Sequence, residues 1–344
     1  MEISEFLAEW NSSSTSISVH TSGSTGRPKE MLVEKRRMLA SARITCDFLN
    51  LHPGDSALLC MPLDYIAGKM MVVRSIERSL DLHTVKPSNH PLADTDLQFD
   101  LVAMVPSQVF GSLQVAEERE KLRSIRNLII GGGAISDEIE QQLKSFPNAV
   151  WSTYGMTETL SHIALRRING NDASAWYTPF DGVAISIVEE EAERIGRLVI
   201  YAPYVCADRL TTNDIVELHP DDYAKGEGAV KRFRVIGRTD NVICSGGIKL
   251  HIEEIEATLR PHFSRPFCIS KCRDEKFGEV AVLIAEKDQD TTKEKQQETA
   301  MMICRNVLPP YSVPKKILIT DEIPLTGNGK IDRAAAQRLS TDLT

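Results

Sequence analysis

Short apolar runs alternate with helical patterns through the first 160 residues, and this alternation constrains the fold more than any other feature. The strand candidates are residues 57–60, 101–105, 127–130 and 149–152. Residues 68–80 and 136–146 have the spacing of helices, the second with Ser136 as its N-cap. Strands that alternate with helices favour βαβ units and a largely parallel sheet.

The pattern changes after residue 180. Four short apolar runs, separated by turn residues, follow each other without a strong helix at 183–188, 197–201, 215–218 and 231–236. They predict a small antiparallel unit over residues 180–239. Beyond Asp240, helices are expected at 252–259 and 293–307, with strands at 280–285 and 316–319.

The predicted fold class is therefore α/β. A large N-terminal domain, residues 1–239, has mixed, largely parallel sheets and includes the small antiparallel unit. A small mobile α+β domain, residues 240–344, follows it.

Composition excludes several function classes. Hydrophobic residues make up 42% of the 344 residues and charged residues 26%, which is typical of globular proteins. The net charge of −8 disfavours non-specific nucleic-acid binding. No run of about 18 apolar residues predicts a membrane span. Residues 1–10 carry three glutamates and no basic residue, so they do not resemble a signal peptide.

The cysteines are odd in number and scattered, which predicts reduced structural thiols in a cytoplasmic protein. They are Cys46, Cys60, Cys206, Cys244, Cys268, Cys272 and Cys304.

The densest local signal is the segment from His20 to Lys29. Two glycines, four hydroxyl side chains and two cations lie within nine residues of it, which suits a loop that binds phosphate oxygens. The spacing differs from the Walker pattern, and a polar surface loop is the alternative interpretation.

Three further segments carry weaker signals. Glu158, after Thr157, could serve Mg²⁺ beside a nucleotide, although a helix start capped by Thr157 has the same pattern. Asp214 could bond a ribose, although an Asn-Asp pair is usually a turn. Lys330 lies on a glycine-rich loop, where a solvent-facing turn is the alternative.

Together with residues 237–240 and 245–249, these motifs resemble, in order and spacing, the signature set of the adenylate-forming superfamily. That superfamily contains acyl-CoA ligases, peptide-synthetase adenylation domains and luciferases. The resemblance runs from about residue 20 to residue 333.

The resemblance implies a role for each matching position. The implied ATP-binding residues are Thr21, Ser22, Gly23, Ser24, Thr25, Gly26, Lys29, Gly132, Gly133, Tyr154, Gly155, Asp214 and Arg238. The implied catalytic residues are Thr157, Glu158 and Lys330, with Glu158 also serving Mg²⁺. The implied CoA-binding residues are Ser245, Gly246 and Gly247, and Asp240 is the implied hinge.

One position departs from the family pattern. Asn213 stands where glycine usually precedes the ribose aspartate. Since asparagine tolerates a positive φ better than most residues, we expect the backbone shape to be kept.

The acid pocket gives the finer prediction. Residues 61–68, followed by Arg74, resemble a segment of the o-succinylbenzoate–CoA ligases of menaquinone biosynthesis. The implied acid-binding residues are Tyr65, Gly68, Arg74 and Gly131. Arg74 would hold the spectator carboxylate of a dicarboxylate substrate, with Lys69 as a weaker candidate. The alternative is that Arg74 is a solvated helix residue. Asp64 is expected to point away from the substrate or to pair with a cation.

The predicted protein is thus an ATP-dependent, Mg²⁺-requiring acid–CoA ligase that forms an acyl-adenylate and then a thioester. Its partners are a small carboxylic acid, ATP and CoA, and the sequence leaves open whether the protein forms a homodimer. The alternatives are an adenylating enzyme for another aryl or acyl acid, with CoA or a carrier protein as acceptor, and a non-catalytic nucleotide-binding relative. The phosphate loop begins early in the chain, which suggests that the usual leading subdomain is missing.

Overall fold

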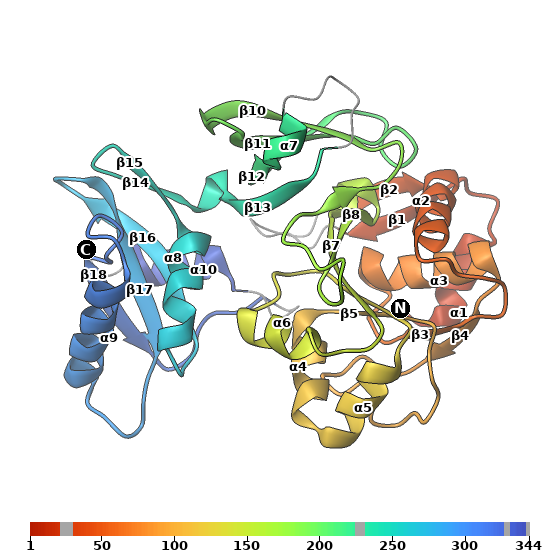
Figure 1. The fold of residues 1–344 in the computed structure, drawn as a ribbon, viewed down its shortest axis with the longest axis horizontal. Helices are drawn as coiled ribbons and strands as arrows, with labels where there is room; N and C mark the ends of the chain where they lie inside the picture. The colour runs from red at the N-terminus through yellow and green to blue at the C-terminus, as the bar shows by residue number, and fades with distance from the viewer. Residues whose placement is uncertain (21–29, 224–230, 327–330, 342–344) are drawn as a thin grey trace.

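A seven-stranded sheet forms the centre of the larger part of the molecule in the computed structural model, which describes residues 1–20, 30–223, 231–326 and 331–341 (Figure 1). Its strands lie in the order β4-β3-β5-β6-β7-β8-β9. They are β3 (Ser56–Leu59), β4 (Asp81–Thr84), β5 (Leu101–Met104), β6 (Asn127–Ile130), β7 (Ala149–Gly155), β8 (His162–Arg167) and β9 (Thr178–Pro179). The pairs from β4 to β7 are parallel, and β8 and β9 are antiparallel.

Helices cover both faces of this sheet. They are α2 (Lys35–Phe48), α3 (Ile66–Arg78), α4 (Pro106–Gln114), α5 (Ala116–Ser124) and α6 (Asp137–Leu143). Alternate strand residues enter two different cores: Leu101 packs in the core with α2 and α3, and Val102 in the core with α4 to α6. A strand buried on both faces is apolar throughout, which is why these short runs were visible in the sequence.

A hairpin precedes this unit, formed by β1 (Ser16–His20) and β2 (Glu30–Glu34), with helix α1 (Ile3–Trp10) before it. Phe6 of α1 is fully buried in the α2–α3 core. None of these three elements was predicted, because each is short and lies beside the polar segment 11–29, whose predicted glycine- and hydroxyl-rich loop is the dominant local signal.

A four-stranded antiparallel sheet follows, in the order β10-β11-β12-β13. Its strands are β10 (Ala184–Ala192), β11 (Ile195–Tyr201), β12 (Leu210–Leu218) and β13 (Phe233–Arg238), with the short helix α7 (Pro220–Tyr223) after β12. Leu198, Val216 and Phe233 join the α2–α3 core, so this sheet packs on the first unit.

The last described residues build a separate sheet with its own cores (Figure 1). Its strands are β14 (Val242–Ser245), β15 (Ile248–His251), β16 (Phe267–Asp274), β17 (Gly278–Glu286) and β18 (Lys316–Thr320). Its helices are α8 (Ile252–Leu259), α9 (Lys293–Val307) and α10 (Arg333–Thr341). The proposed boundary at Asp240 lies in the turn η2 (Thr239–Asn241) between the two sheets.

The predicted fold class is confirmed: a mixed, largely parallel sheet, an antiparallel sheet and an α+β unit occur in the predicted order. Ser136 caps α6, accepting a hydrogen bond from the Ile139 amide. All seven cysteines are free. Within the described ranges, no helix is long and apolar enough to cross a membrane.

Candidate active site

Four polar side chains meet where β7, β12 and β13 approach each other. The Tyr154 hydroxyl donates a hydrogen bond of 2.5 Å to Asp214 Oδ2. Arg238 donates from one terminal nitrogen to Asp214 Oδ1 at 2.9 Å. Its Nε and its other terminal nitrogen donate to the two carboxylate oxygens of Asp240, each at 2.9 Å. Asp214 and Arg238 are cross-strand partners, so the sheet register itself brings them together.

The charges in this network stabilise each other. The hydrogen bonds to Asp240 and the charges of Asp214 and Asp240 raise the pKa of Arg238, and they outweigh its burial, which alone would lower that pKa. Burial alone would raise the pKa of Asp240, but the ion pair with Arg238 outweighs burial and the pKa lies below its usual value. Burial, and then the charge of Asp214, raise the pKa of Tyr154 well above its usual value, so its hydroxyl stays a donor.

Asn213 differs from expectation. It is not among the residues with a positive φ, and it lies inside β12, so the turn interpretation of the Asn-Asp pair is wrong. Its side chain instead bonds Asp240, which helps to lower the pKa of that carboxyl. A position where the family has glycine therefore carries a polar contact to the Arg238–Asp240 pair.

The segment after β7 is a tight turn. A Cβ on Gly155 would lie 2.3 Å from the Ser161 carbonyl, so only glycine fits there. The turn η1 (Thr157–Thr159) has Met156 as its N-cap, so the interpretation of Thr157 as cap is wrong. Thr157 is buried, whereas Glu158 points its exposed side chain outward from the same turn.

Glu158 fits the requirement of Mg²⁺ for a hard oxygen ligand. Mg²⁺ in nucleotide sites is usually held by one or two carboxylates together with substrate phosphates. Within the described ranges, no group of three or more His, Cys, Asp or Glu could hold a metal by itself. A single exposed carboxylate agrees with the first arrangement, in which substrate phosphates supply the other ligands.

Gly131 and Gly132 follow directly after β6, at the carboxyl edge of the parallel strands, where ligands of such sheets bind. A Cβ on Gly131 would lie 2.3 Å from Thr153 Oγ1, and Gly132 has a φ of 79°. Both positions therefore require glycine. Gly133 is exposed beside them.

The predicted acid segment lies at the start of α3. Tyr65 is the N-cap residue, and it forms a parallel bridge with His20, the last described residue before the predicted phosphate loop. Gly68 packs against Pro62, whose carbonyl oxygen would lie 2.3 Å from a Cβ at residue 68. The bridge and the close packing bring the acid segment beside the entrance to that loop.

Arg74 is buried, with 2% of its surface exposed, so the interpretation as a solvated helix residue is wrong. One terminal nitrogen donates to Ser161 Oγ at 2.5 Å, the other lies 3.8 Å from Met71 Sδ, and Nε has no partner. Burial lowers the pKa of Arg74 to about 10. Among the described residues, no carboxylate pairs with this cation.

The neighbouring charges are already occupied. Lys69 is buried and donates to the Ser18 carbonyl at 2.6 Å, which directs it toward β1. Asp64 pairs with the amino group of Met1 at 3.3 Å, which confirms the expectation that it would pair with a cation. Unlike Lys69 and Asp64, Arg74 therefore keeps a donor, Nε, without a partner.

Other predicted residues lie elsewhere. Thr21 to Lys29 and Lys330 lie outside the described residues. Ser245, Gly246 and Gly247 form the turn between β14 and β15, in the C-terminal sheet rather than with the nucleotide residues. Gly246 and Gly247 have φ angles of 57° and 85°, and the Gly246 amide donates to the Phe277 carbonyl at 2.8 Å.

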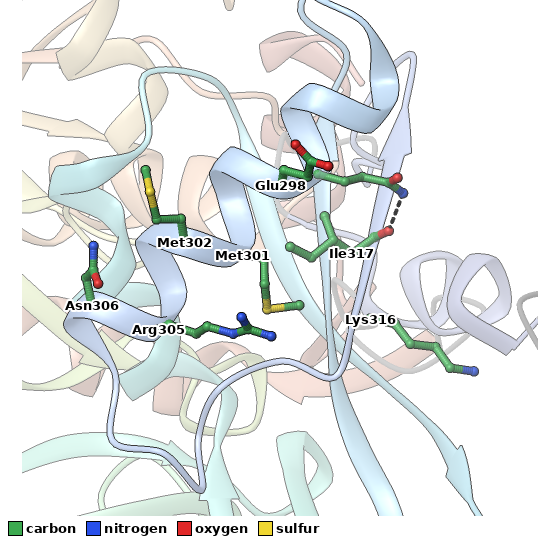
Figure 2. A pocket seen from close by; sticks show the side chains of 8 residues that line it. Glu298, Met301, Met302, Arg305, Asn306, Lys316 and Ile317 are labelled. Carbon is green, nitrogen blue, oxygen red and sulfur yellow. Dashed lines mark hydrogen bonds between the residues drawn. The ribbon is translucent and has the colours of Figure 1, made fainter.

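A pocket of about 780 Å³ lies far along the same C-terminal sheet, between α9 and β18 (Figure 2). Met301, Arg305 and Ile317 are among its lining residues, and Gln297, which also lines it, donates to the Ile317 carbonyl at 2.8 Å. No predicted site residue lines it.

The family is identified by comparison. The model of the AMP-binding enzyme family matches residues 7–207, and the chain belongs to this family. The prediction of an adenylate-forming, AMP-forming acid–CoA ligase class is thereby confirmed, in agreement with the names of its relatives.

Two curated relatives are 2-succinylbenzoate–CoA ligases. The Enterococcus faecalis protein is 26% identical over 331 residues, covering 91% of this chain and 67% of its own. The Listeria monocytogenes protein is 24% identical over 351 residues, covering 96% and 71%. The chain is thus shorter than these relatives, as predicted.

Two solved structures are similar. An acyl-CoA synthetase (AMP-forming)/AMP-acid ligase II-like protein from Dyadobacter fermentans is 33% identical, with a TM-score of 0.61 and coverage of 96% of this chain and 91% of that one. The o-succinylbenzoate coenzyme A synthetase from Bacillus subtilis, solved with ATP and magnesium, has a TM-score of 0.73 at 20% identity. It covers 92% of this chain and 68% of its own, and at that identity it supports the fold alone.

Sequence reasoning missed the residues around Arg74. Ser161 and His162 follow the Tyr154–Thr159 motif after one intervening residue, and Thr45 comes from α2. The position of Ser161 and His162 next to the motif was the available signal. Nothing in the sequence marked Thr45, because its contact spans 117 positions.

Proposed function

We propose that the protein activates 2-succinylbenzoate with ATP and transfers the acyl group to CoA. One carboxylate attacks the α-phosphorus of ATP and displaces pyrophosphate, and the thiol sulfur of CoA then attacks the acyl carbon and displaces AMP. The other carboxylate is the one that Arg74 would hold. The observation that carries the choice of acid is the buried, uncompensated charge of Arg74.

Burial removes the hydration of the Arg74 guanidinium. A buried charge without a partner costs several kcal/mol, and proteins normally offset this with a counter-charge. Arg74 has a neutral hydroxyl on one nitrogen and an unpartnered Nε–H. A carboxylate bound in bidentate fashion through these nitrogens would supply the missing charge. A monocarboxylate whose only charge reacts at the phosphate could not do so.

The Tyr154–Asp214–Arg238 network supports the nucleotide part of the proposal. Asp214 would accept from the ribose hydroxyls, and Arg238 would hold it in place while adding positive charge near the phosphates. Gly131 and Gly132 follow β6 at the carboxyl edge of the sheet, where a planar base or acyl group would bind. Mg²⁺, held by Glu158 and phosphate oxygens, would neutralise charge that develops on the phosphates.

CoA is the proposed thiol because the curated relatives are named as CoA ligases. The Ser245–Gly247 turn would receive the thiol-bearing arm, because glycines with positive φ let the backbone approach closely. Its location on the C-terminal sheet supports a second step that uses a different surface from adenylation. Asp240 would be the hinge residue, and Lys330 the lysine of the first step.

The first test is activity on a defined acid. Purified protein with ATP, Mg²⁺, CoA and 2-succinylbenzoate should release pyrophosphate and AMP and form a thioester. Release with only a fatty or simple aryl acid would contradict the choice of substrate. Adenylation without CoA transfer would instead indicate a carrier-protein acceptor, and ATP binding without turnover on any acid would indicate a non-catalytic relative.

The second test is Arg74→Ala. Losing a charge-assisted pair of about 1.5–3 kcal/mol should raise the KM for 2-succinylbenzoate by roughly 10- to 100-fold. Arg43→Ala is the matched control, because Arg43 is a largely exposed cation on α2. An unchanged KM in Arg74→Ala, with normal folding, would rule out Arg74 as the anion holder.

A further inference from the structure

A chain of buried and partly buried hydrogen bonds runs from Arg74 to the backbone of α2. Arg74 donates to Ser161 Oγ at 2.5 Å, and Ser161 Oγ lies 3.4 Å from His162 Nδ1. On the other side of the ring, His162 Nε2 lies 3.0 Å from Thr45 Oγ1. Thr45 then donates to the Ser41 carbonyl at 3.1 Å.

The far end of the chain sets the direction of every bond. Because the Ser41 carbonyl can only accept, the Thr45 hydroxyl donates its one proton to that carbonyl. Thr45 Oγ1 must therefore accept from His162, which places the imidazole proton on Nε2. Nδ1 is then a lone pair that accepts from the Ser161 hydroxyl, and Ser161 Oγ is left to accept from Arg74.

The charges around the ring agree with this assignment. His162 is buried, and its burial together with the nearby charge of Arg74 lowers its pKa well below the usual value. The other titratable group close to Arg74 is Cys46 of α2, whose pKa is raised, chiefly by burial. Phe180 lies edge-to-face against the imidazole with ring centroids 5.6 Å apart, which restricts its rotation.

We infer that His162, held as the neutral Nε2–H tautomer by Thr45, positions the Arg74 guanidinium for the spectator carboxylate of the substrate. The inference rests on the proposed function. Because Ser161 accepts from one terminal nitrogen while the other lies against Met71 Sδ, the orientation of the guanidinium is fixed, and its unpartnered Nε–H is the donor left for a carboxylate. Because the ring is neutral, Arg74 is the single charge of this cluster and selects an anion.

The test is Thr45→Val, which keeps the shape of Thr45 and removes its hydroxyl. Without that acceptor the imidazole loses its tautomer preference, and Ser161 is free to turn its proton toward Arg74. We expect the KM for 2-succinylbenzoate to rise about fivefold with little change in kcat, the loss of about one neutral hydrogen bond. Thr45→Ser, which keeps the hydroxyl, should restore the wild-type KM.

Ser75→Ala is the matched control. Ser75 is a buried hydroxyl on the helix of Arg74, bonded to a carbonyl four residues earlier in the way that Thr45 bonds Ser41. It has no part in the chain and should leave the KM unchanged. A fivefold rise in Ser75→Ala as well would show a general packing effect and overturn the inference.

Two monocarboxylate analogues, each lacking one carboxylate of 2-succinylbenzoate, separate positioning from structure. For the analogue that keeps only the reacting carboxylate, Thr45→Val should leave kcat/KM at the wild-type value. An equal loss of kcat/KM on 2-succinylbenzoate and on this analogue would contradict a positioning role for His162. If Arg74→Ala raises the KM and Thr45→Val does not, this inference fails and the proposed function stands. If neither does, the proposed function itself has failed.

The tautomer is also directly measurable. Nitrogen NMR of ¹⁵N-histidine-labelled protein should show a protonated Nε2 and an unprotonated Nδ1 for His162 at neutral pH. His162→Phe, which keeps a ring against Phe180, identifies the signal by its loss. A signal with the proton on Nδ1, or on both nitrogens, would overturn the assigned direction of the chain.

Discussion

At the scale of single residues, the site depends on polar groups whose partners come from distant segments. The Tyr154–Asp214 bond joins residues 60 positions apart, and the Thr45–His162 bond joins residues 117 apart. Local sequence patterns carry no information on such pairs. The motifs correctly pointed to Asp214 and Arg238, which the fold brings together as cross-strand partners. By contrast, whether Arg74 is solvated or buried depends on the packing of α3 against α2 and on the turn at Ser161.

His162 makes the stability of the protein sensitive to acid. Its pKa is lowered in the folded state, so below the unfolded value of about 6.5 the unfolded chain binds a proton that the folded chain does not. Stability is therefore present above pH 6.5 and is lost as the pH falls. Between pH 7.5 and 5.5 this one residue should lower the free energy of unfolding by about 1 kcal/mol.

The measurement is urea unfolding at both pH values, with His162→Gln as the comparison. The unfolding free energy of the variant should fall by about 1 kcal/mol less than that of the wild type over this interval, because the variant has no imidazole to protonate. An identical loss in both proteins would mean that His162 accepts a proton while folded.

At the scale of elements, strands buried on both faces were predictable and polar strands were not. The run predicted at residues 127–130 matches β6, and the helices predicted at 252–259 and 293–307 match α8 and α9. By contrast β12 begins at Leu210, five residues before the predicted start at 215, because its first half carries the polar residues of the site. A functional strand exchanges apolar pattern for ligand contacts, and so it escapes prediction.

The start of α3 depends on Gly68. Gly68→Ala would place a methyl group 2.3 Å from the Pro62 carbonyl, which is backbone and cannot turn aside. The helix would have to move away from residues 61–65, including Tyr65 and its bridge to His20. We expect a loss of about 1–3 kcal/mol in unfolding free energy and a raised KM for the acid.

Ala67→Gly is the control for helix propensity in the same turn. It should cost about 1 kcal/mol without changing the KM for the acid. If Gly68→Ala behaves in the same way as this control, the close packing on Pro62 does not position the acid segment.

At the scale of the whole molecule, two bodies with separate cores are joined at the turn after Arg238. The C-terminal body has its own anchor, a bidentate pair in which Arg333 of α10 donates to buried Glu256 of α8 at 2.6 and 2.7 Å. Arg333 comes three positions after Lys330, so this ion pair fixes the end of the segment that carries the proposed catalytic lysine.

Arg333→Ala should therefore act on the C-terminal body alone. Removing one partner leaves the Glu256 carboxylate buried and unpaired, which costs about 3–5 kcal/mol. Calorimetry should show the unfolding transition of this body shifted to lower temperature, with ATP binding to the larger body retained. A uniform shift of both transitions would indicate that the two bodies unfold as one unit.

The turn between β7 and β8 has a consequence for redesign. The eight residues from Tyr154 to Ser161 include Tyr154, Thr157 and Glu158, which we propose act on the nucleotide, and Ser161, which bonds Arg74. Its backbone is tightly confined, with no room for a side chain at Gly155 and a positive φ at Leu160. Mutations in this hairpin that are meant to change the acid specificity would therefore also alter residues proposed to act on ATP. Mutations in helix α3 leave the residues proposed to bind ATP unchanged. Helix α3 is therefore the better starting point for directed evolution of the acid specificity.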